Sequence, residues 1–302
     1  MTTLSVKEIW RYPVKSMRGE MLADARIERG GIPGDRIWVV RGAGGSMIPD
    51  RKNALAGLLN CSARYDAASG DVEITLPGAK RIILNDKTKD EVAAALAPLV
   101  ETPAISLCRA GALRPESVAA DVDPATVEAA IRRVFGFTPN DATFPSFAQY
   151  PASALQSTMH SFTRYQRRSE TSDVLGFDFF PTNLLTEASL RHFEAMVTHA
   201  PIDRRRFRPN VLIADDAALA APIEETWEGR EVVLGTARLF SVLRCVRCVM
   251  PSLPQAGEGA SIPRDAVFNP ANTRAMHTVG LYTTVLGEGQ VAVGDVVRVG
   301  AP

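Results

Sequence analysis

The sequence has few of the residues on which several classes of protein depend. Its 302 residues include only four cysteines, too few for a disulfide framework. The formal net charge is zero, which gives no support for nucleic-acid or anionic-membrane binding. No apolar run approaches the roughly 20 residues that span a bilayer, and the N-terminus lacks the basic-then-apolar order of a secretory signal. These absences predict a cytoplasmic protein without nucleic-acid or membrane partners.

What is present is an ordinary globular composition in which short strand patterns dominate. Hydrophobic residues make up 46% of the chain, enough for one large core or two smaller ones. Helical spacing is limited to residues 50–59, 90–99, 123–134 and 186–198, and residues 146–172 have no clear period, as in a long loop or insertion. Strands are predicted at residues 4–10, 22–27, 36–40, 62–65, 72–76, 81–84, 104–108, 180–186, 211–214, 231–233 and 237–243, with a closing hairpin formed by residues 278–285 and 291–299.

Two of the four cysteines, Cys245 and Cys248, follow a strand-like run and alternate with Arg244 and Arg247. The thiolate is the reactive and metal-binding form of cysteine, and nearby positive charge lowers the pKa of a thiol. This segment is therefore the first candidate for chemistry.

Four interpretations of the cysteine pair compete. Half of a zinc site needs a second Cys or His pair, whereas Cys61 and Cys108 are isolated. A dithiol redox pair usually opens a helix, which Pro251 makes unfavourable here. A single thiolate could bind a soft metal or metal cofactor, and two buried cysteines could simply pack as small apolar side chains. The pair alone leaves these interpretations open.

Two basic segments are candidates for anion binding. Pro13 and Gly19 bracket a turn that carries Lys15, Ser16 and Arg18, which is either a solvated basic turn or an anion cradle. Further along, four arginines in residues 204–208 precede a strand, and Pro209 favours an extended Arg208. Arginine binds phosphate through two parallel hydrogen bonds. The strand that runs into a helix at Thr186, a plausible N-cap, places backbone N–H groups where an anion could bind.

Six motifs, in order, resemble those of MOSC domain proteins that carry an N-terminal MOSC β-barrel domain. This family includes molybdenum cofactor sulfurase, in its C-terminal part, and the amidoxime reducing component. The motifs are Tyr12-Pro13-Val14-Lys15-Ser16-Met17-Arg18-Gly19, Gly34-Asp35-Arg36-Ile37-Trp38, Leu184-Leu185-Thr186-Glu187-Ala188-Ser189-Leu190, Phe207-Arg208-Pro209-Asn210, Cys245-Val246-Arg247-Cys248, and Val279-Gly280-Leu281-Tyr282 with Val293-Gly294-Asp295.

The resemblance implies a mainly β fold with peripheral helices (α+β): an N-terminal β-barrel-like domain at residues 1–115 and a MOSC β-barrel domain at residues 116–302. It also implies a molybdenum cofactor, in which a pterin dithiolene holds the metal. Cys248 would be the metal ligand and catalytic residue, because a soft thiolate suits a metal already bound by sulfur. Cys245 would be a neighbouring cofactor-binding residue that tunes the site. The cofactor phosphate would be bound by Lys15, Ser16, Arg36 and Arg208, with Asn210 hydrogen-bonding nearby.

The activity implied by the resemblance is a molybdenum-dependent oxidoreductase that reduces N-oxygenated, for example N-hydroxylated, small molecules. A second hypothesis is a carrier that hands the cofactor, or sulfur, to an accepting enzyme, and a third is an interaction domain without metal. No cysteine-rich ferredoxin segment follows the closing hairpin, so the electrons would come from a ferredoxin- or cytochrome b5-like protein. The family also carries an association with pyridoxal phosphate.

The sequence departs from the family pattern at two places. The Ser/Thr pair that precedes a proline in the reducing component is replaced by Phe179 and Phe180, so Asp178, Thr182 or Asn183 would have to compensate. The family's Thr-Thr-Val-Asp-Pro run after the ligand is replaced by residues 250–254, which alters the predicted rim of the substrate pocket.

Overall fold

The computed structural model is mainly β with helices at the periphery, which confirms the predicted fold class. It describes residues 3–42, 52–101, 104–111, 121–135, 147–166, 176, 179–195, 201–216, 218–219, 221–248, 250–255, 262 and 278–301. Within these ranges no helix is long and apolar enough to cross a membrane. The predicted cytoplasmic location stays a prediction.

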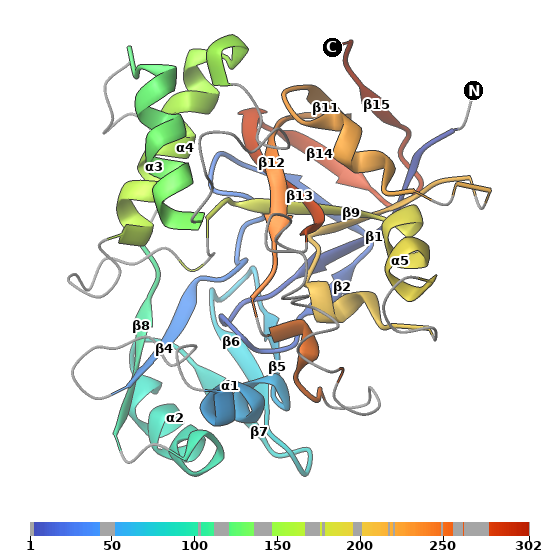
Figure 1. Ribbon diagram of the computed structural model, residues 1–302. Helices are drawn as coiled ribbons and strands as arrows, with labels where there is room; N and C mark the ends of the chain where they lie inside the picture. Colours follow the sequence, from blue (N-terminus) through green and yellow to red (C-terminus); the bar gives the residue numbers. More distant parts are fainter. Residues whose placement is uncertain are drawn as a thin grey trace.

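A barrel-like sheet forms the body of the molecule (Figure 1). Its eight strands are hydrogen-bonded in the order β15-β11-β12-β13-β9-β10-β1-β2. The sheet curls back on itself, because the start of β1 also pairs with the chain just before β15: Val6 N donates to Asp295 O over 2.8 Å. The strands are β1 (Ser5–Arg11), β2 (Glu20–Leu22), β9 (Thr182–Thr186), β10 (Val211–Ala214), β11 (Glu231–Leu234), β12 (Ala237–Val246), β13 (Thr278–Gly287) and β15 (Val297–Val299).

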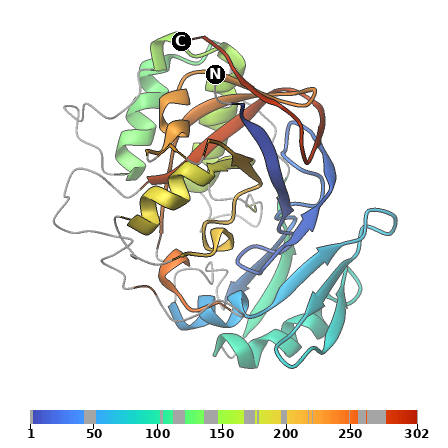
Figure 2. The same ribbon diagram turned by 90° about the vertical axis from the view of Figure 1, so that its right-hand side faces the viewer.

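A smaller unit lies at one end of the molecule, beside the barrel (Figures 1 and 2). It has its own apolar core, which includes Trp38 and Leu58. Its elements are β4 (Trp38–Gly42), α1 (Lys52–Leu59), β5 (Ser62–Tyr65), β6 (Val72–Thr75), β7 (Arg81–Leu84), α2 (Lys89–Leu96), η3 (Ala97–Val100) and β8 (Ile105–Arg109). The predicted division at residues 1–115 and 116–302 stays a prediction. Strands of the N-terminal segment pair with strands on the other side of this predicted boundary. β1 pairs with β10, and β3 (Asp24–Ile27) pairs with β14 (Gly289–Ala292).

The predicted loop at residues 146–172 is wrong over the part of it that the structure describes. This part contains η5 (Phe147–Gln149) and α4 (Ala152–Gln166), which packs with α3 (Pro124–Phe135) against one side of the sheet (Figure 1). The helical period is hidden because small polar residues occupy buried positions: Thr158 donates to Ala154 O over 2.7 Å, and Thr284 Oγ1 lies 2.5 Å from Ser157 Oγ. A hydrophobicity pattern cannot register a buried hydroxyl.

The predicted closing hairpin is also wrong. Both edges of β13 are already paired, one with β12 and the other with β9, so the following chain cannot fold back against it. It forms β14, which pairs with β3, and β15, which pairs with β11. Gly294, with a positive φ of 95°, lies in the turn between β14 and β15.

The strand-to-helix junction at Thr186 is confirmed, but its predicted use for anion binding is not. Thr186 caps α5 (Glu187–Phe193) and accepts from the Ser189 N–H over 3.2 Å. The Ala188 N–H donates to Asp215 Oδ2 over 2.7 Å. The helix start is therefore satisfied by the chain itself. Other short helices in the described residues are η7 (Arg204–Phe207), η8 (Ile223–Trp227) and η9 (Met250–Ser252).

A fully buried carboxyl group, Glu224 on η8, accepts hydrogen bonds from the hydroxyls of Thr186, over 2.5 Å, and Ser189. Burial raises the pKa of Glu224 above its ordinary value of 4.5, while the two hydroxyls act in the opposite direction. Because the folded state then holds the proton more tightly than the unfolded chain, this stability contribution declines as pH rises through the folded-state pKa.

We therefore expect the wild type to lose thermal stability relative to Glu224→Gln as the pH is raised from 4.5 to 8. The difference between the two unfolding midpoints should change in that direction. A difference of about 1 kcal/mol would change the midpoint by roughly 2 °C in a chain of this size. Scanning calorimetry at both pH values measures the change. Parallel pH profiles for the two proteins would contradict the expectation.

Candidate functional site

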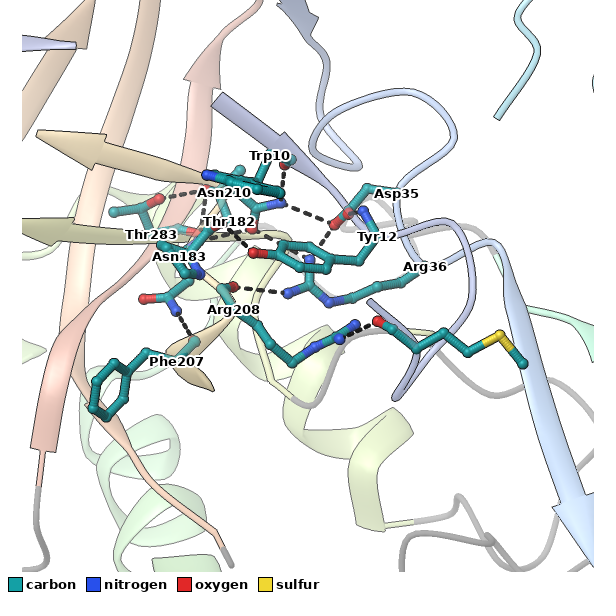
Figure 3. A network of polar contacts seen from close by, with 12 residues as sticks. Trp10, Tyr12, Asp35, Arg36, Thr182, Asn183, Phe207, Arg208, Asn210 and Thr283 are labelled. Atoms are coloured by element: carbon teal, nitrogen blue, oxygen red, sulfur yellow. Dashed lines mark hydrogen bonds and ion pairs between the residues drawn. The ribbon is translucent and has the colours of Figure 1, made fainter. Parts of the chain in front are cut away.

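Two guanidinium groups lie over the ring of Tyr12, just after β1 (Figure 3). The Cζ atom of Arg208 is 4.2 Å from the ring centroid and that of Arg36 is 4.9 Å away. The Tyr12 hydroxyl donates to Pro209 O over 3.0 Å, and burial raises the pKa of this phenol, so it stays neutral. Cation–π contact with a buried ring contributes about 0.5–2 kcal/mol per pair. The ring thereby holds two positive charges at a defined spacing.

Asp35 and Asn210 fix the orientation of Arg36. Asp35 accepts the Tyr12 N–H over 2.7 Å and forms an ion pair with the Arg36 guanidinium. Asn210 donates to Asp35 Oδ2 over 3.1 Å, and Arg36 donates to Asn210 Oδ1 over 3.3 Å and to Arg208 O over 3.2 Å. The network therefore joins three sequence motifs that are far apart in the chain (Figure 3).

Three of the predicted phosphate-binding residues have left-handed backbone conformations. In the described part of the chain five residues other than glycine have positive φ, and three of these are Ser16 at 69°, Arg36 at 50° and Arg208 at 50°. Such conformations cost of the order of 1–3 kcal/mol each and concentrate at functional sites. The predicted extended conformation of Arg208 is wrong. Arg208 caps the C-terminus of η7 in a left-handed conformation, and its N–H donates to Arg205 O over 3.0 Å.

The loop that carries Lys15 and Ser16 is buried rather than solvated. Lys15 is 8% exposed and Ser16 1% exposed. Arg208 donates to Met17 O and so brings this loop to the Tyr12 network. Within the described residues, Ser16 Oγ and Arg18 Nε are buried without a hydrogen-bond partner. A buried polar group left unpaired costs about 1–3 kcal/mol, and each of these donors could bind an anion oxygen. Hydroxyl, ammonium and guanidinium groups are the kinds of donor that suit a phosphate.

The two cysteines of the pair have opposite surroundings. Cys245, on β12, is buried in the aromatic cluster beneath α3 and α4, whereas Cys248, beyond the end of β12, is exposed. Met250 donates its N–H to the Cys248 sulfur over 3.5 Å. Neither Cys245 nor Cys248 forms a disulfide. Cys245 therefore packs in the aromatic cluster. Its predicted role beside the cofactor stays a prediction, as does the association with pyridoxal phosphate.

The two arginines next to the cysteines, Arg244 and Arg247, bind the protein itself. Arg244 forms ion pairs with Glu225, over 3.0 Å, and with Glu228, over 3.1 Å. Arg247 donates to Val279 O and, over 2.8 Å, to Phe207 O. The second contact ties the residue before Cys248 to the residue before Arg208, and so connects the exposed thiol with the basic network.

Asn183 takes part in the same link between the Cys248 segment and the basic network. It donates to Phe207 O over 3.2 Å, and its backbone carbonyl accepts the Asn210 N–H over 2.8 Å. Gly280, with φ of 88°, leaves room here, since a Cβ atom would lie 2.9 Å from Asn183 Oδ1 and 3.1 Å from Arg247 Nη2. Tyr12, Asp35 and Arg247 were not predicted as site residues, although all three lie within the motifs, because only side-chain contacts reveal what they hold.

The departures from the family pattern lie in well-packed surroundings. Phe179 and Phe180 pack with Phe162 and Tyr282 in the aromatic cluster. Thr182 donates to Thr283 O over 3.2 Å and so serves the sheet. Asp178 lies outside the described residues. Asn183, unlike Thr182, contacts the basic network, because its N–H donates to Asn210 Oδ1 over 3.2 Å.

The network gives a stability prediction. Asn210→Asp would remove the donor to Asp35 and place a second carboxylate beside it, at a position 1% exposed. Breaking a buried hydrogen-bond network in this way costs about 3 kcal/mol. Urea unfolding measures this loss. Asn60→Asp, at an exposed asparagine bonded to Ala56 O, is the matched control and should change the free energy of unfolding by less than about 1 kcal/mol. Equal losses in both variants would contradict the expectation.

The chain matches known proteins over most of its length. A model of the MOSC N-terminal beta barrel domain matches residues 3–103, and a MOSC domain model matches residues 171–298. Mitochondrial amidoxime-reducing component 1 from Homo sapiens and from Mus musculus are each 25% identical, over 84% of this chain and 67% of the relative. A crystal structure of the YuaD protein from Bacillus subtilis, 11% identical and aligned over 99% of this chain and 96% of that one, has a TM-score of 0.40, too low to carry an argument. The two domain matches establish that the chain belongs to the MOSC domain proteins, with a MOSC N-terminal β-barrel domain ahead of the MOSC domain.

Proposed function

We propose that this protein binds the molybdenum cofactor and reduces N-oxygenated small molecules, such as N-hydroxylated amines or amidines. One observation carries the proposal. Arg36 and Arg208 lie over the ring of Tyr12, Arg208 also binds the loop that carries Lys15 and Ser16, and Phe207 O accepts from the arginine beside the exposed Cys248. The similarity to amidoxime-reducing components supports the choice of substrate class.

Each residue has a defined task in this proposal. Lys15, Ser16 and Arg208 would bind the cofactor phosphate, with charge-assisted hydrogen bonds stronger than neutral ones. Arg36 would join them, held by its ion pair with Asp35 and its hydrogen bond to Asn210. The Cys248 thiolate would bind the metal. When bound, the cofactor supplies the electron transfer that accompanies movement of an oxygen atom.

Electrons would come from a separate protein of the ferredoxin or cytochrome b5 type. In the described residues no cluster of three or more His, Cys, Asp or Glu side chains could hold a metal ion. The described part of the chain therefore offers no cysteine-ligated iron–sulfur centre of its own. The substrate partner is a small molecule, whose identity depends on the segment that follows Cys248.

A carrier role is the second candidate, and the exposure of Cys248 favours it. An exposed thiol allows a cofactor, or a persulfide sulfur, to be passed to an accepting enzyme without opening of the fold. The two roles share the same binding residues and differ in turnover.

The decisive experiment separates binding from turnover. The protein is purified from a host that makes the cofactor, its molybdenum content is measured, and a reductant is added with an N-hydroxylated amidine. Bound molybdenum with reduction of the substrate supports the enzyme. Bound molybdenum that moves to an apo-acceptor without turnover supports the cofactor carrier, and protein without molybdenum overturns both the enzyme and the cofactor carrier.

Replacement of each cysteine tests the ligand. Cys248→Ala should remove nearly all molybdenum-linked turnover, because it deletes the proposed thiolate ligand. Cys245→Ala should retain most of it, because that side chain packs among aromatic rings and its loss costs only about 1 kcal/mol of stability. Molybdenum content and turnover per bound metal are measured in parallel. If the Cys248 variant keeps active molybdenum at the wild-type level, the assignment is wrong.

A further inference from the structure

The buried arginine of η7, Arg206, reaches the chain segment that follows Cys248. Its side chain is almost fully enclosed, with Arg206 only 4% exposed. Its Nη1 donates to Pro251 O over 3.0 Å and to Leu253 O over 2.8 Å. Two carbonyls of one short segment therefore converge on one guanidinium nitrogen.

That segment begins at the residue whose N–H contacts the thiol. Met250 donates to the Cys248 sulfur over 3.5 Å, and Leu253 donates to Met250 O over 3.2 Å. On its other side the segment packs on the smaller unit, because the Met250 side chain contacts Leu59 of α1. Arg206 thus binds the carbonyl oxygens of Pro251 and Leu253, at the end of a turn. The first N–H of that turn, from Met250, donates to the Cys248 sulfur.

Arg206 and Arg247 donate in opposite directions between the same two segments. Arg247, beside Cys248, donates to Phe207 O, while Arg206, beside Phe207, donates to the carbonyls after Cys248. Burial of a guanidinium is unfavourable unless its hydrogen bonds are satisfied. The arrangement therefore favours one separation between the arginine-rich segment and the thiol segment.

We propose that Arg206 is a positioning residue for Cys248. By holding Pro251 and Leu253, it keeps the Met250 N–H on the sulfur and keeps the segment that replaces the family's Thr-Thr-Val-Asp-Pro run at one place. Hydrogen bonds to a metal-bound sulfur tune the metal's electronic properties. The consequence for a bound metal rests on the proposed function, whereas the consequence for residues 250–253 does not.

The test compares three variants of the full-length chain. Arg206→Met removes the donors while keeping an unbranched side chain, and Arg206→Lys keeps the charge but offers a single ammonium group. Arg204→Met is the matched control, since Arg204 lies on the same short helix but pairs with Glu8 on β1, over 2.5 Å. Hydrogen exchange is measured in peptides covering residues 250–255, together with the thermal midpoint. The molybdenum-loaded chains are then compared by Mo(V) electron paramagnetic resonance.

We expect exchange of the Met250 and Leu253 amides to accelerate roughly five- to tenfold in Arg206→Met, less in Arg206→Lys, and not in Arg204→Met. In the loaded protein the Mo(V) g-values should shift in Arg206→Met at unchanged metal content. Wild-type exchange in both Arg206 variants would overturn the proposal. So would faster exchange throughout the chain in Arg206→Lys, which indicates a general loss of stability. If no variant, nor the wild type, binds molybdenum, the proposed function fails while the exchange result still decides the role of Arg206.

Discussion

The candidate site depends on keeping two guanidinium groups beside each other in a largely enclosed place. Like charges repel strongly where water is scarce, so both groups need fixed partners. Arg36 and Arg208 both lie over the ring of Tyr12, which attracts each of them, and Asp35 forms an ion pair with Arg36. The rest of the network orients these few groups, and a positive site is therefore formed by the fold before any anion arrives.

The barrel explains why this place is stable. Asn210 lies just before β10 and Asn183 on β9, two parallel neighbours, and the carbonyl of Asn210 accepts the Trp10 N–H from β1. Adjacent strands thus deliver three segments to the same end of the sheet. The left-handed conformations of Ser16, Arg36 and Arg208 persist because the surrounding hydrogen bonds outweigh their cost.

The thiol segment is joined to this site by main-chain carbonyls rather than by contact between charged side chains. Phe207 O accepts from both Asn183 and Arg247, and the carbonyls of Pro251 and Leu253 accept from Arg206. Carbonyl oxygens accept from arginine without neutralising it. Cys248 can therefore lie exposed at a fixed distance from the basic network while the arginines of that network keep their charge.

The sequence by itself determined the fold class, the candidate residues and their family, because ordered motifs and alternating strands are local signals. It could not reveal the helix at Ala152–Gln166, whose buried face uses hydroxyls, or the partners of β14 and β15, which depend on the edges of β13 already being occupied. Only the tertiary structure placed Cys245 in the aromatic core and Cys248 at the surface, and only it assigned Tyr12, Arg206 and Arg247 to holding other residues in place. The physical reason is that the role of a side chain in this site depends on which backbone groups lie within hydrogen-bonding distance. Those backbone groups belong to segments up to about 200 positions away in the sequence.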